Sequence, residues 1–275
     1  MIEIKVLLEN TSISSNFTPK HGLSIAIYTG SSNILLDVGP DKTFYENANK
    51  MQCNIEQIET LILSHSHIDH AGGLNKFVEV NKRAEILLFD KYDSKYFTKI
   101  IGPLKISVGI KCNDAATKRI KTISSNQQID EKTTFIRNNS THYKKPTFNK
   151  TLYKAIGKNY TLDNFEHEGI LVIDDGELVI FNSCSHNGIY NSIASVKNIF
   201  KGKKIRSYIG GLHYTNPFTK QHENTIELDT LIDFVKTEGI KLYSGHCTGK
   251  YCIKYLKKEL GDKFVTIATG SELFV

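Results

Sequence analysis

The 275-residue sequence contains no tryptophan and no apolar run near the ~20 residues that a membrane-spanning helix needs. Its first residues, Met1 to Lys5, do not have the pattern of a secretory signal peptide. It also lacks an arginine-rich or aromatic-interleaved basic patch of the kind that binds nucleic acid. These absences predict a cytoplasmic protein with no membrane or nucleic-acid partner.

The cysteines of the sequence do not have the pattern of a disulfide framework. The five cysteines, at positions 53, 112, 184, 247 and 252, are odd in number and scattered. The net charge of +6 permits an anionic substrate without requiring one. Hydrophobic content of 40% and charged content of 23% are ordinary for a globular protein, and the length allows one large domain or two small ones.

Metal-binding side chains gather in residues 61–73, which read LILSHSHIDHAGG. An apolar strand at 61–64 leads directly into His65, His67, Asp69 and His70. Imidazole nitrogens and carboxylate oxygens are ligands that zinc accepts. Alternation lets His65 and His67 point the same way while Asp69 and His70 face a second position. The spacing therefore predicts a metal site, with its ligands divided between two ions.

The second half of the chain repeats strand, polar loop and helix, with His186, His213 and His246 each following a predicted strand. In open α/β sheets, sites form where the carboxyl ends of strands meet loops, so we expect these histidines to reach one edge. An amphipathic helix is predicted over 222–238, with its apolar face formed by Ile226, Leu228, Leu231, Ile232 and Val235. His21, His142 and His222 have no ligand context and are predicted to lie on the surface or on a helix.

Residues 90–164 have weak apolar periodicity and are rich in Lys, Asn, Thr and Ser. We interpret them as an insertion over the site, with short strands near 104–108 and 134–136. Loops held by a rigid scaffold commonly determine specificity, and the basic residues at 91–158 would attract an anionic group. A surface insertion without a role in binding is the alternative.

The motif His-x-His-x-Asp-His-Ala-Gly-Gly resembles the signature of the metallo-β-lactamase superfamily. CSHNGI at 184–189, GGLH at 210–213 and GHCTG at 245–249 narrow the resemblance to the superfamily II metal-dependent hydrolases, a branch that includes archaeal enzymes joining a pterin to ribofuranosylaminobenzene phosphate. The resemblance covers residues 1–89 and 163–275. It implies an α/β fold, the four-layer αβ/βα sandwich, in a single domain over 1–275 with a variable insertion at about 90–164.

The resemblance also implies roles for single residues. One ion would be held by His65, His67 and His186, and the other by Asp69, His70 and His246. Asp37 would accept hydrogen bonds that support the metal loop, although a turn-capping carboxylate is the alternative. Cys184 occupies the position of a bridging aspartate in most members, so a bridging thiolate and a packing role are both open. His167 lacks the usual Gly-His setting and is left out, while Glu168 would approach the site.

The expected activity is metal-dependent hydrolysis of a small, anionic phosphoester or ester by a metal-bound hydroxide. Asp69 would orient the hydroxide, and His213 would contact the substrate or donate a proton, with metal ligation as its lesser role. Two zinc ions are expected, with manganese or iron as alternatives. A pterin-condensing synthase that displaces diphosphate is the second hypothesis, and a binding or sensing module is the third. The partner is a small-molecule substrate, and the oligomeric state is open.

Overall fold

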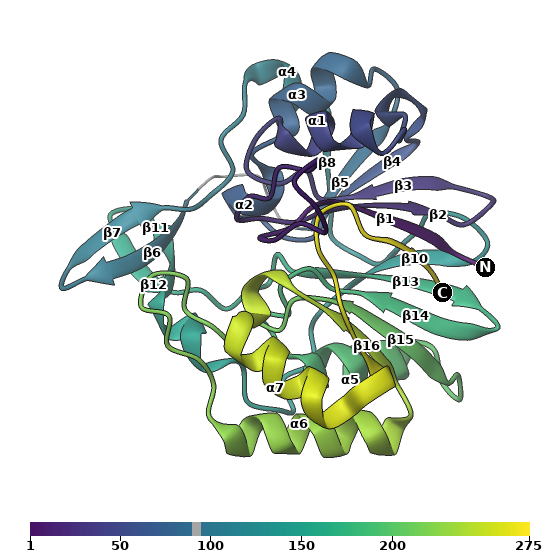
Figure 1. Cartoon of the computed structure of the whole chain (residues 1–275). Helices are drawn as coiled ribbons and strands as arrows, with labels where there is room; N and C mark the ends of the chain where they lie inside the picture. The colour runs from purple at the N-terminus through teal and green to yellow at the C-terminus, as the bar shows by residue number, and fades with distance from the viewer. Residues whose placement is uncertain (90–94) are drawn as a thin grey trace.

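Two large sheets lie face to face in the protein, with helices over the outer face of each (Figure 1). The computed structural model describes residues 1–89 and 95–275, so that the first five residues of the predicted insertion, 90–94, lie outside the described residues. The layers run helix, sheet, sheet, helix from the top to the bottom of Figure 1. This arrangement confirms the predicted α/β four-layer sandwich.

The first sheet has the strand order β18-β1-β2-β3-β4-β5-β8. Its strands are β1 (Glu3–Leu8), β2 (Ser24–Tyr28), β3 (Asn33–Leu36), β4 (Thr60–Leu63), β5 (Glu85–Phe89), β8 (Ile120–Ile123) and β18 (Glu272–Phe274). The helices near it are α1 (Thr43–Lys50), α2 (Ile68–Ala71), α3 (Leu74–Val80) and α4 (Asp114–Thr117). Of these, α1, α3 and α4 cover its outer face (Figure 1).

The second sheet has the order β17-β16-β15-β14-β13-β10-β9. Its strands are β9 (Gln127–Gln128), β10 (Thr133–Arg137), β13 (Gly169–Asp175), β14 (Glu177–Phe181), β15 (Ile205–Gly210), β16 (Lys241–Ser244) and β17 (Phe264–Thr266). Its outer face is covered by α5 (Ile189–Ile199), α6 (Thr225–Glu238) and α7 (Lys250–Leu260) (Figure 1).

Both faces of the central strands are buried, which explains why these strands are apolar without a polar alternation. In β4, Leu61 and Leu63 pack into the core beneath α1 and α3, whereas Ile62 points into the core between the two sheets. In β13, Val172 packs toward the helices and Leu171 packs into the core between the sheets. The sandwich therefore has three apolar layers, one between the sheets and one under each helical layer.

The carboxyl ends of the parallel strands meet at one edge of the sandwich. β3, β4 and β5 are parallel neighbours in the first sheet, and β14, β15 and β16 are parallel neighbours in the second. The segments that follow β4, β14 and β16 carry all of the predicted metal-binding side chains. The topology therefore brings the two halves of the chain together at this edge.

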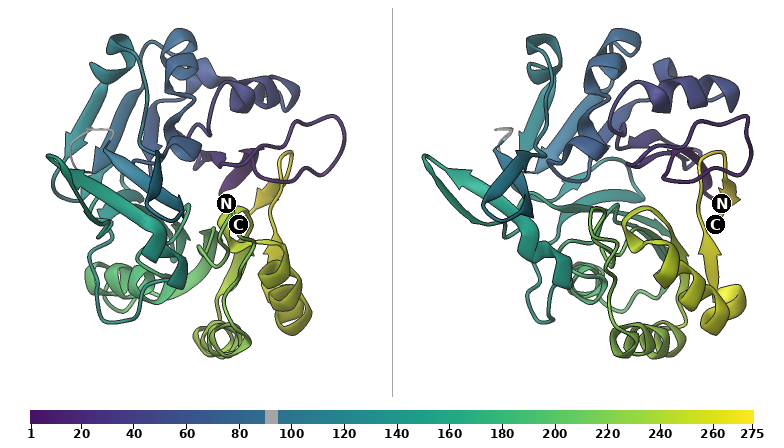
Figure 2. Two further views of the ribbon diagram at one scale, coloured as in Figure 1. Left: turned by 90° about the vertical axis from the view of Figure 1, so that its left-hand side faces the viewer. Right: turned by 60° about the vertical axis from the view of Figure 1, so that its left-hand side comes forward.

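The stretch predicted as an insertion divides among three sheets. β8 extends the first sheet, and β9 and β10 extend the second. The rest forms a separate sheet, in the order β12-β11-β6-β7, from β6 (Tyr96–Ile101), β7 (Leu104–Ser107), β11 (Leu152–Ile156) and β12 (Asn159–Leu162). This small sheet projects beside the two large ones at the left of Figure 1, the side that comes forward in Figure 2.

One local prediction is wrong, and one strand was missed. Ile226 was placed on the apolar face of α6 but is 76% exposed, because the helix begins at Thr225 and Ile226 lies in its first turn. Leu228, Leu231, Ile232 and Val235 are buried as expected. The strand β18, which pairs with β1 at the edge of the first sheet, was not predicted. Among residues 1–89 and 95–275, no helix combines the length and hydropathy needed to cross a membrane.

Candidate metal centre

Three histidines direct ring nitrogens to one point at the edge of the sandwich. His65 and His67 follow β4, and His186 follows β14. One ligand atom from each lies within 4.8 Å of those of the other two. The Nε2 atoms of all three rings are buried and have no hydrogen-bond partner. Orphaned buried nitrogens are costly unless something binds them, so the donor set fits a borderline metal such as zinc.

The tautomers of these rings are set by their other nitrogens. Ser64 Oγ donates to Asp37 Oδ2 (2.7 Å), so His65 Nδ1–H donates to Ser64 Oγ (2.8 Å). His186 Nδ1 lies 3.1 Å from Asn149 Oδ1, which accepts its proton. Both contacts leave the Nε2 lone pair facing the shared point. Burial, followed by the neighbouring imidazoles, lowers the pKa of His65 and His186, and burial lowers that of His67 to about 3. All three rings are therefore neutral at physiological pH, the form that binds metal.

A second group consists of Asp69, His70 and His246. One ligand atom from each of these residues lies within 4.8 Å of those of the other two. His70 Nε2 lies 3.2 Å from His246 Nε2, and Asp69 Oδ2 lies 3.5 Å from both. His70 Nδ1 donates to Asp37 Oδ2 (2.7 Å), and His246 Nδ1 donates to Asn10 Oδ1 (3.0 Å). Burial lowers the pKa of His70, but the carboxylates of Asp69 and Asp37 outweigh it and raise that pKa to about 10. The carboxylates therefore favour a cation at this position.

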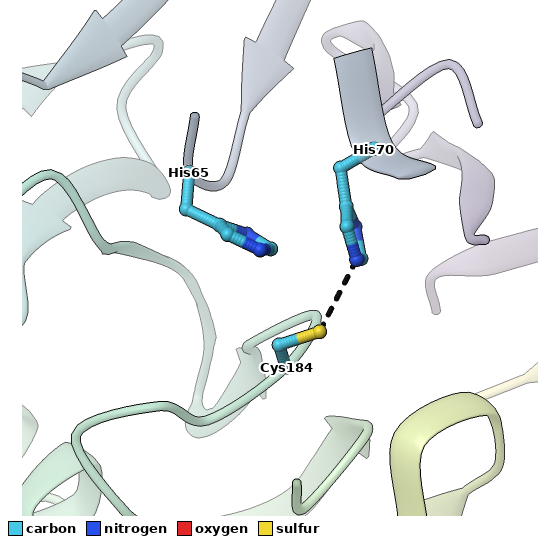
Figure 3. A group of neighbouring side chains, drawn as sticks. All are labelled: His65, His70 and Cys184. Atoms are coloured by element: carbon cyan, nitrogen blue, oxygen red, sulfur yellow. Dashed lines mark hydrogen bonds between the residues drawn. The ribbon is translucent and has the colours of Figure 1, made fainter. Parts of the chain in front are cut away.

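Cys184 lies between the two groups. Its Sγ is 3.1 Å from His70 Nε2, and His65, His70 and Cys184 form a further group within 4.8 Å (Figure 3). Figure 3 shows Cys184, in the loop after β14, directing its thiol toward the rings of His65 and His70. Cys247 Sγ lies 3.5 Å from Cys184 Sγ. The geometry gives Cys184 access to both groups, which a residue with a packing role alone does not need.

Buried carboxylates hold the ligand loops in place. Asp37 has no exposed surface, and its Oδ1 accepts from Ser64 N (2.8 Å). Glu168 Oε1 accepts from His186 N (2.6 Å), and its Oε2 accepts from the backbone and side chain of Asn187. Glu9 accepts from His246 N and from Thr11. Of these, the sequence indicated Asp37 and Glu168, but not Glu9.

The backbone is strained at three of these positions. Asp37, His213 and His246 have φ of 60°, 54° and 50°, in the left-handed region that non-glycine residues seldom occupy. Such conformations persist where the surroundings enforce them, and they concentrate at functional sites. The backbone conformation is therefore a second, independent indication that this edge of the fold is a functional site.

Comparisons with known proteins agree with this geometry. The family model described as the metallo-beta-lactamase superfamily matches residues 17–86, which include the motif at 65–70. A 7,8-dihydropterin-6-methyl-4-(beta-D-ribofuranosyl)-aminobenzene-5'-phosphate synthase of Methanocaldococcus jannaschii is 27% identical, over 98% of this chain and 95% of its own. The solved structure of Tm1679, a metal-dependent hydrolase of the beta-lactamase superfamily, superposes with a TM-score of 0.82 at 23% identity, covering 100% of this chain and 99% of its own.

Over residues 17–86 the chain matches the metallo-beta-lactamase superfamily model, and its fold is the one seen in the superfamily's solved structure. A further relative, an uncharacterised protein of M. jannaschii, is 23% identical over 90% of each chain. The superfamily implies divalent metal, and the two groups of side chains described above supply suitable ligand atoms.

A cavity of about 1100 Å³ opens over the metal-binding groups. His67, Asp69, His186 and His246 line it, and so does His213. The ring of His213 lies 4.2 Å from that of His186, and neither of its nitrogens has a hydrogen-bond partner. His213 is therefore free to contact a bound molecule.

Two histidines differ from their sequence-based interpretation or extend it. His21 had no ligand context and was predicted to lie on the surface or on a helix; its side chain is indeed 51% exposed, but its Nε2 is 3.5 Å from Asp69 Oδ2 and it lines the cavity. It comes from the loop before β2, and no local motif marks it. His167 is buried beside His67, but its Nδ1 accepts from Ser66 N and its Nε2 contacts Asp163 Oδ2. Both of its nitrogens are engaged by the protein, and His167 also forms a further group of possible ligands with His67 and Asp163, within 4.8 Å.

Proposed function

We propose that this protein is a metal-dependent hydrolase acting on a small anionic ester or phosphoester. The observation that carries the proposal is the convergence of three unpartnered Nε2 atoms, from His65, His67 and His186, beside the Asp69, His70 and His246 group. We propose two zinc ions, one for each group, with manganese or iron as alternatives. When bound, divalent ions supply Lewis acidity toward a substrate oxygen and a water nucleophile at neutral pH.

The side chains of the chain would orient the reactants and move protons. Asp69 faces the cavity with its side chain 22% exposed, so its carboxylate is positioned to accept a proton from attacking water. Burial raises the pKa of Asp69, but His70 and the hydrogen bonds from His246 and His70 lower it well below its usual range, so the group is ionised at neutral pH. His213 would donate a proton to the leaving group from the other side of the cavity. Asp37 would keep His70 in the tautomer that presents Nε2.

The first test measures metal content by mass spectrometry in the wild type and in His67→Ala and His246→Ala. We expect about two equivalents in the wild type and about one in each variant, with loss of hydrolysis of bis(4-nitrophenyl) phosphate and 4-nitrophenyl acetate. His142→Ala, which changes an exposed histidine, is the matched control and should match the wild type. Metal content that none of the site variants changes would overturn the proposal.

The second candidate is a synthase that forms a C–N bond by displacing diphosphate. The similarity to the M. jannaschii synthase over 98% of this chain supports it. Incubation with a pterin diphosphate and an aminobenzoate-type acceptor, followed by product analysis, separates the two reactions. A condensed product with release of diphosphate would favour the synthase, and hydrolysis without condensation would favour the hydrolase.

A further inference from the structure

The cavity over the metal-binding groups has a row of lysines along one side. Lys250, Lys254 and Lys257 line it from α7, and Lys220 lines it from the loop after β15. At 100° per residue the three α7 lysines fall within about 60° on one face of the helix. The opposite face carries Cys252, Leu256 and Leu260, which are buried in the core of the second sheet.

These α7 lysines are not paired with acidic groups. In the part of the chain that the structure describes, none of the three makes an ion pair or a hydrogen bond through its ammonium group, whereas Lys258 on the same helix pairs with Glu259. The acidic residues that line the cavity are Glu9 and Asp69, and both are engaged in the metal-centre loops described above. The lysine row therefore leaves positive charge facing the cavity without a partner.

Apolar side chains also line the cavity. Ile106 of β7, Phe148 and Leu152 line it from the small sheet and the turn before β11, and Phe218 lines it from the loop after β15. Ile106 is 39% exposed and Phe218 is 49% exposed, which is high for large apolar side chains beside a cavity. A ligand with an aromatic or aliphatic body would cover these surfaces.

We infer that Lys250, Lys254 and Lys257 bind a phosphate monoester group of the substrate, separate from the bond that reacts. Three ammonium groups match the dianionic charge and the three terminal oxygens of a phosphate monoester. Lys250 is four residues beyond His246, and the row extends about 10 Å along α7 at 1.5 Å per residue. The phosphate is thus held along the cavity wall while the apolar body lies against Phe148 and Ile106. This inference rests on the proposed hydrolase function, because it specifies the substrate class of the same cavity.

The test is calorimetric titration of the metal-loaded protein with benzyl phosphate and with benzyl alcohol, which differ in the phosphate alone. We expect benzyl phosphate to bind at least about tenfold more tightly, and the Lys254→Gln/Lys257→Gln double variant to weaken it by about tenfold or more. The matched control, Lys258→Gln, removes the same charge from the same helix outside the cavity and should change affinity by less than about twofold. Raising the salt concentration should weaken binding in the wild type more than in the double variant.

Equal affinity of the wild type and the double variant would overturn the inference. Loss of binding in His67→Ala, together with no effect of the lysine changes, would place the phosphate on the metal-binding groups and would also overturn it. The proposed hydrolase function would survive both results. Conversely, a protein that purifies without metal but shows lysine-dependent binding would overturn the hydrolase and retain the phosphate site.

Discussion

Asp37 shows how one buried carboxylate organises two metal-binding side chains. It contacts His70 directly and His65 through the Ser64 hydroxyl, and its positive φ aims it between them. Because the ligand geometry depends on this acceptor, the site is sensitive to a change that leaves all six candidate ligands in place. Sequence alone indicated the residue, but it left a turn-capping role open.

The change Asp37→Asn tests this dependence. Asp37 accepts hydrogen bonds from Ser64 N, Ser64 Oγ and His70 Nδ1. The amide of asparagine replaces one acceptor oxygen by an N–H donor, so the tautomer of His70 is no longer enforced. We expect metal affinity to fall about 10- to 100-fold, measured by competition with a chromogenic chelator. Asp41→Asn, an exposed carboxylate on the same connection, is the control. Wild-type affinity in Asp37→Asn would contradict the role assigned to Asp37.

Glu168 has a comparable role for the loop of His186. Its carboxylate accepts from the backbone N–H of His186 and Asn187, from Asn187 Nδ2 and from Asn138 Nδ2. Burial raises its pKa, while these donors oppose the rise. The residue therefore ties β13 to the loop after β14.

Glu168→Gln places an amide N–H against this ring of donors and leaves at least one of them unsatisfied. We expect the free energy of unfolding to fall by about 2 kcal/mol, measured by urea denaturation. Glu166→Gln, whose carboxylate is exposed and contacts only Asn164 among the described residues, should change it by less than about 0.5 kcal/mol. Similar effects of the two changes would mean that the buried network does not stabilise the loop.

At the scale of elements, regular helices were the most predictable. The helix predicted over 222–238 is α6, which ends at the predicted residue and begins three residues later, at Thr225. Residues 95–164 were the least predictable. The strands expected near 104–108 and 134–136 are β7 and β10, but the edge strand β8 and its pairing with β5 were not predicted, because β5 and β8 are separated in the sequence and β8 has only four residues. The apolar content of β8 is too small for periodicity to reveal which sheet it joins.

Two positions of α6, Leu231 and Ile226, give a direct test of the corrected apolar face. Leu231→Ala should lower the free energy of unfolding by about 2–4 kcal/mol, because the side chain is fully buried beneath the helix. Ile226→Ala should change it by less than about 0.5 kcal/mol, because Ile226 is 76% exposed. Both are measured by urea denaturation, and an equal loss in the two variants would restore the original prediction for Ile226.

The hairpin of β13 and β14 is linked to the β9–β10 turn by charge. The hydrogen bond from Lys132 to Asp175 (2.8 Å) is the main cause of the lowering of the Asp175 pKa to about 2. A lowered pKa stabilises the fold above the ordinary value near 3.9, and this stabilisation is lost as the pH falls toward 2. Asp175→Asn should therefore lower the free energy of unfolding by at most about 1 kcal/mol at pH 7, because the pair is exposed. The difference from the wild type should vanish near pH 2, and a difference that persists there would exclude the ion pair as its source.

At the scale of the whole molecule, the candidate ligands couple the two halves of the sandwich. His65, His67 and His70 follow β4 of the first sheet, while His186 and His246 follow β14 and β16 of the second. Metal bound by both sets would stabilise the folded state through mass action, because the unfolded chain does not hold the set together.

Removal of metal with a chelator should lower the melting temperature in one cooperative transition. At a metal concentration about 100-fold above its dissociation constant the lost stabilisation is about 2.7 kcal/mol, which corresponds to about 5–10 °C for a chain of this size. Differential scanning calorimetry measures the shift, and return of zinc should reverse it. A transition that does not move would contradict metal binding across the two sheets.

The sequence by itself indicated the metal-binding stretch at 65–70, because its ligands follow an apolar strand at close local spacing. The four-layer architecture was implied by the resemblance of that motif to a known superfamily. The sequence also indicated His186 and His246 through their positions after strands. Only the tertiary structure brought His21, Glu9 and the α7 lysines into the same cavity. These residues lie in segments with no local signal, and their proximity follows from the pairing of distant strands and the facing of two sheets.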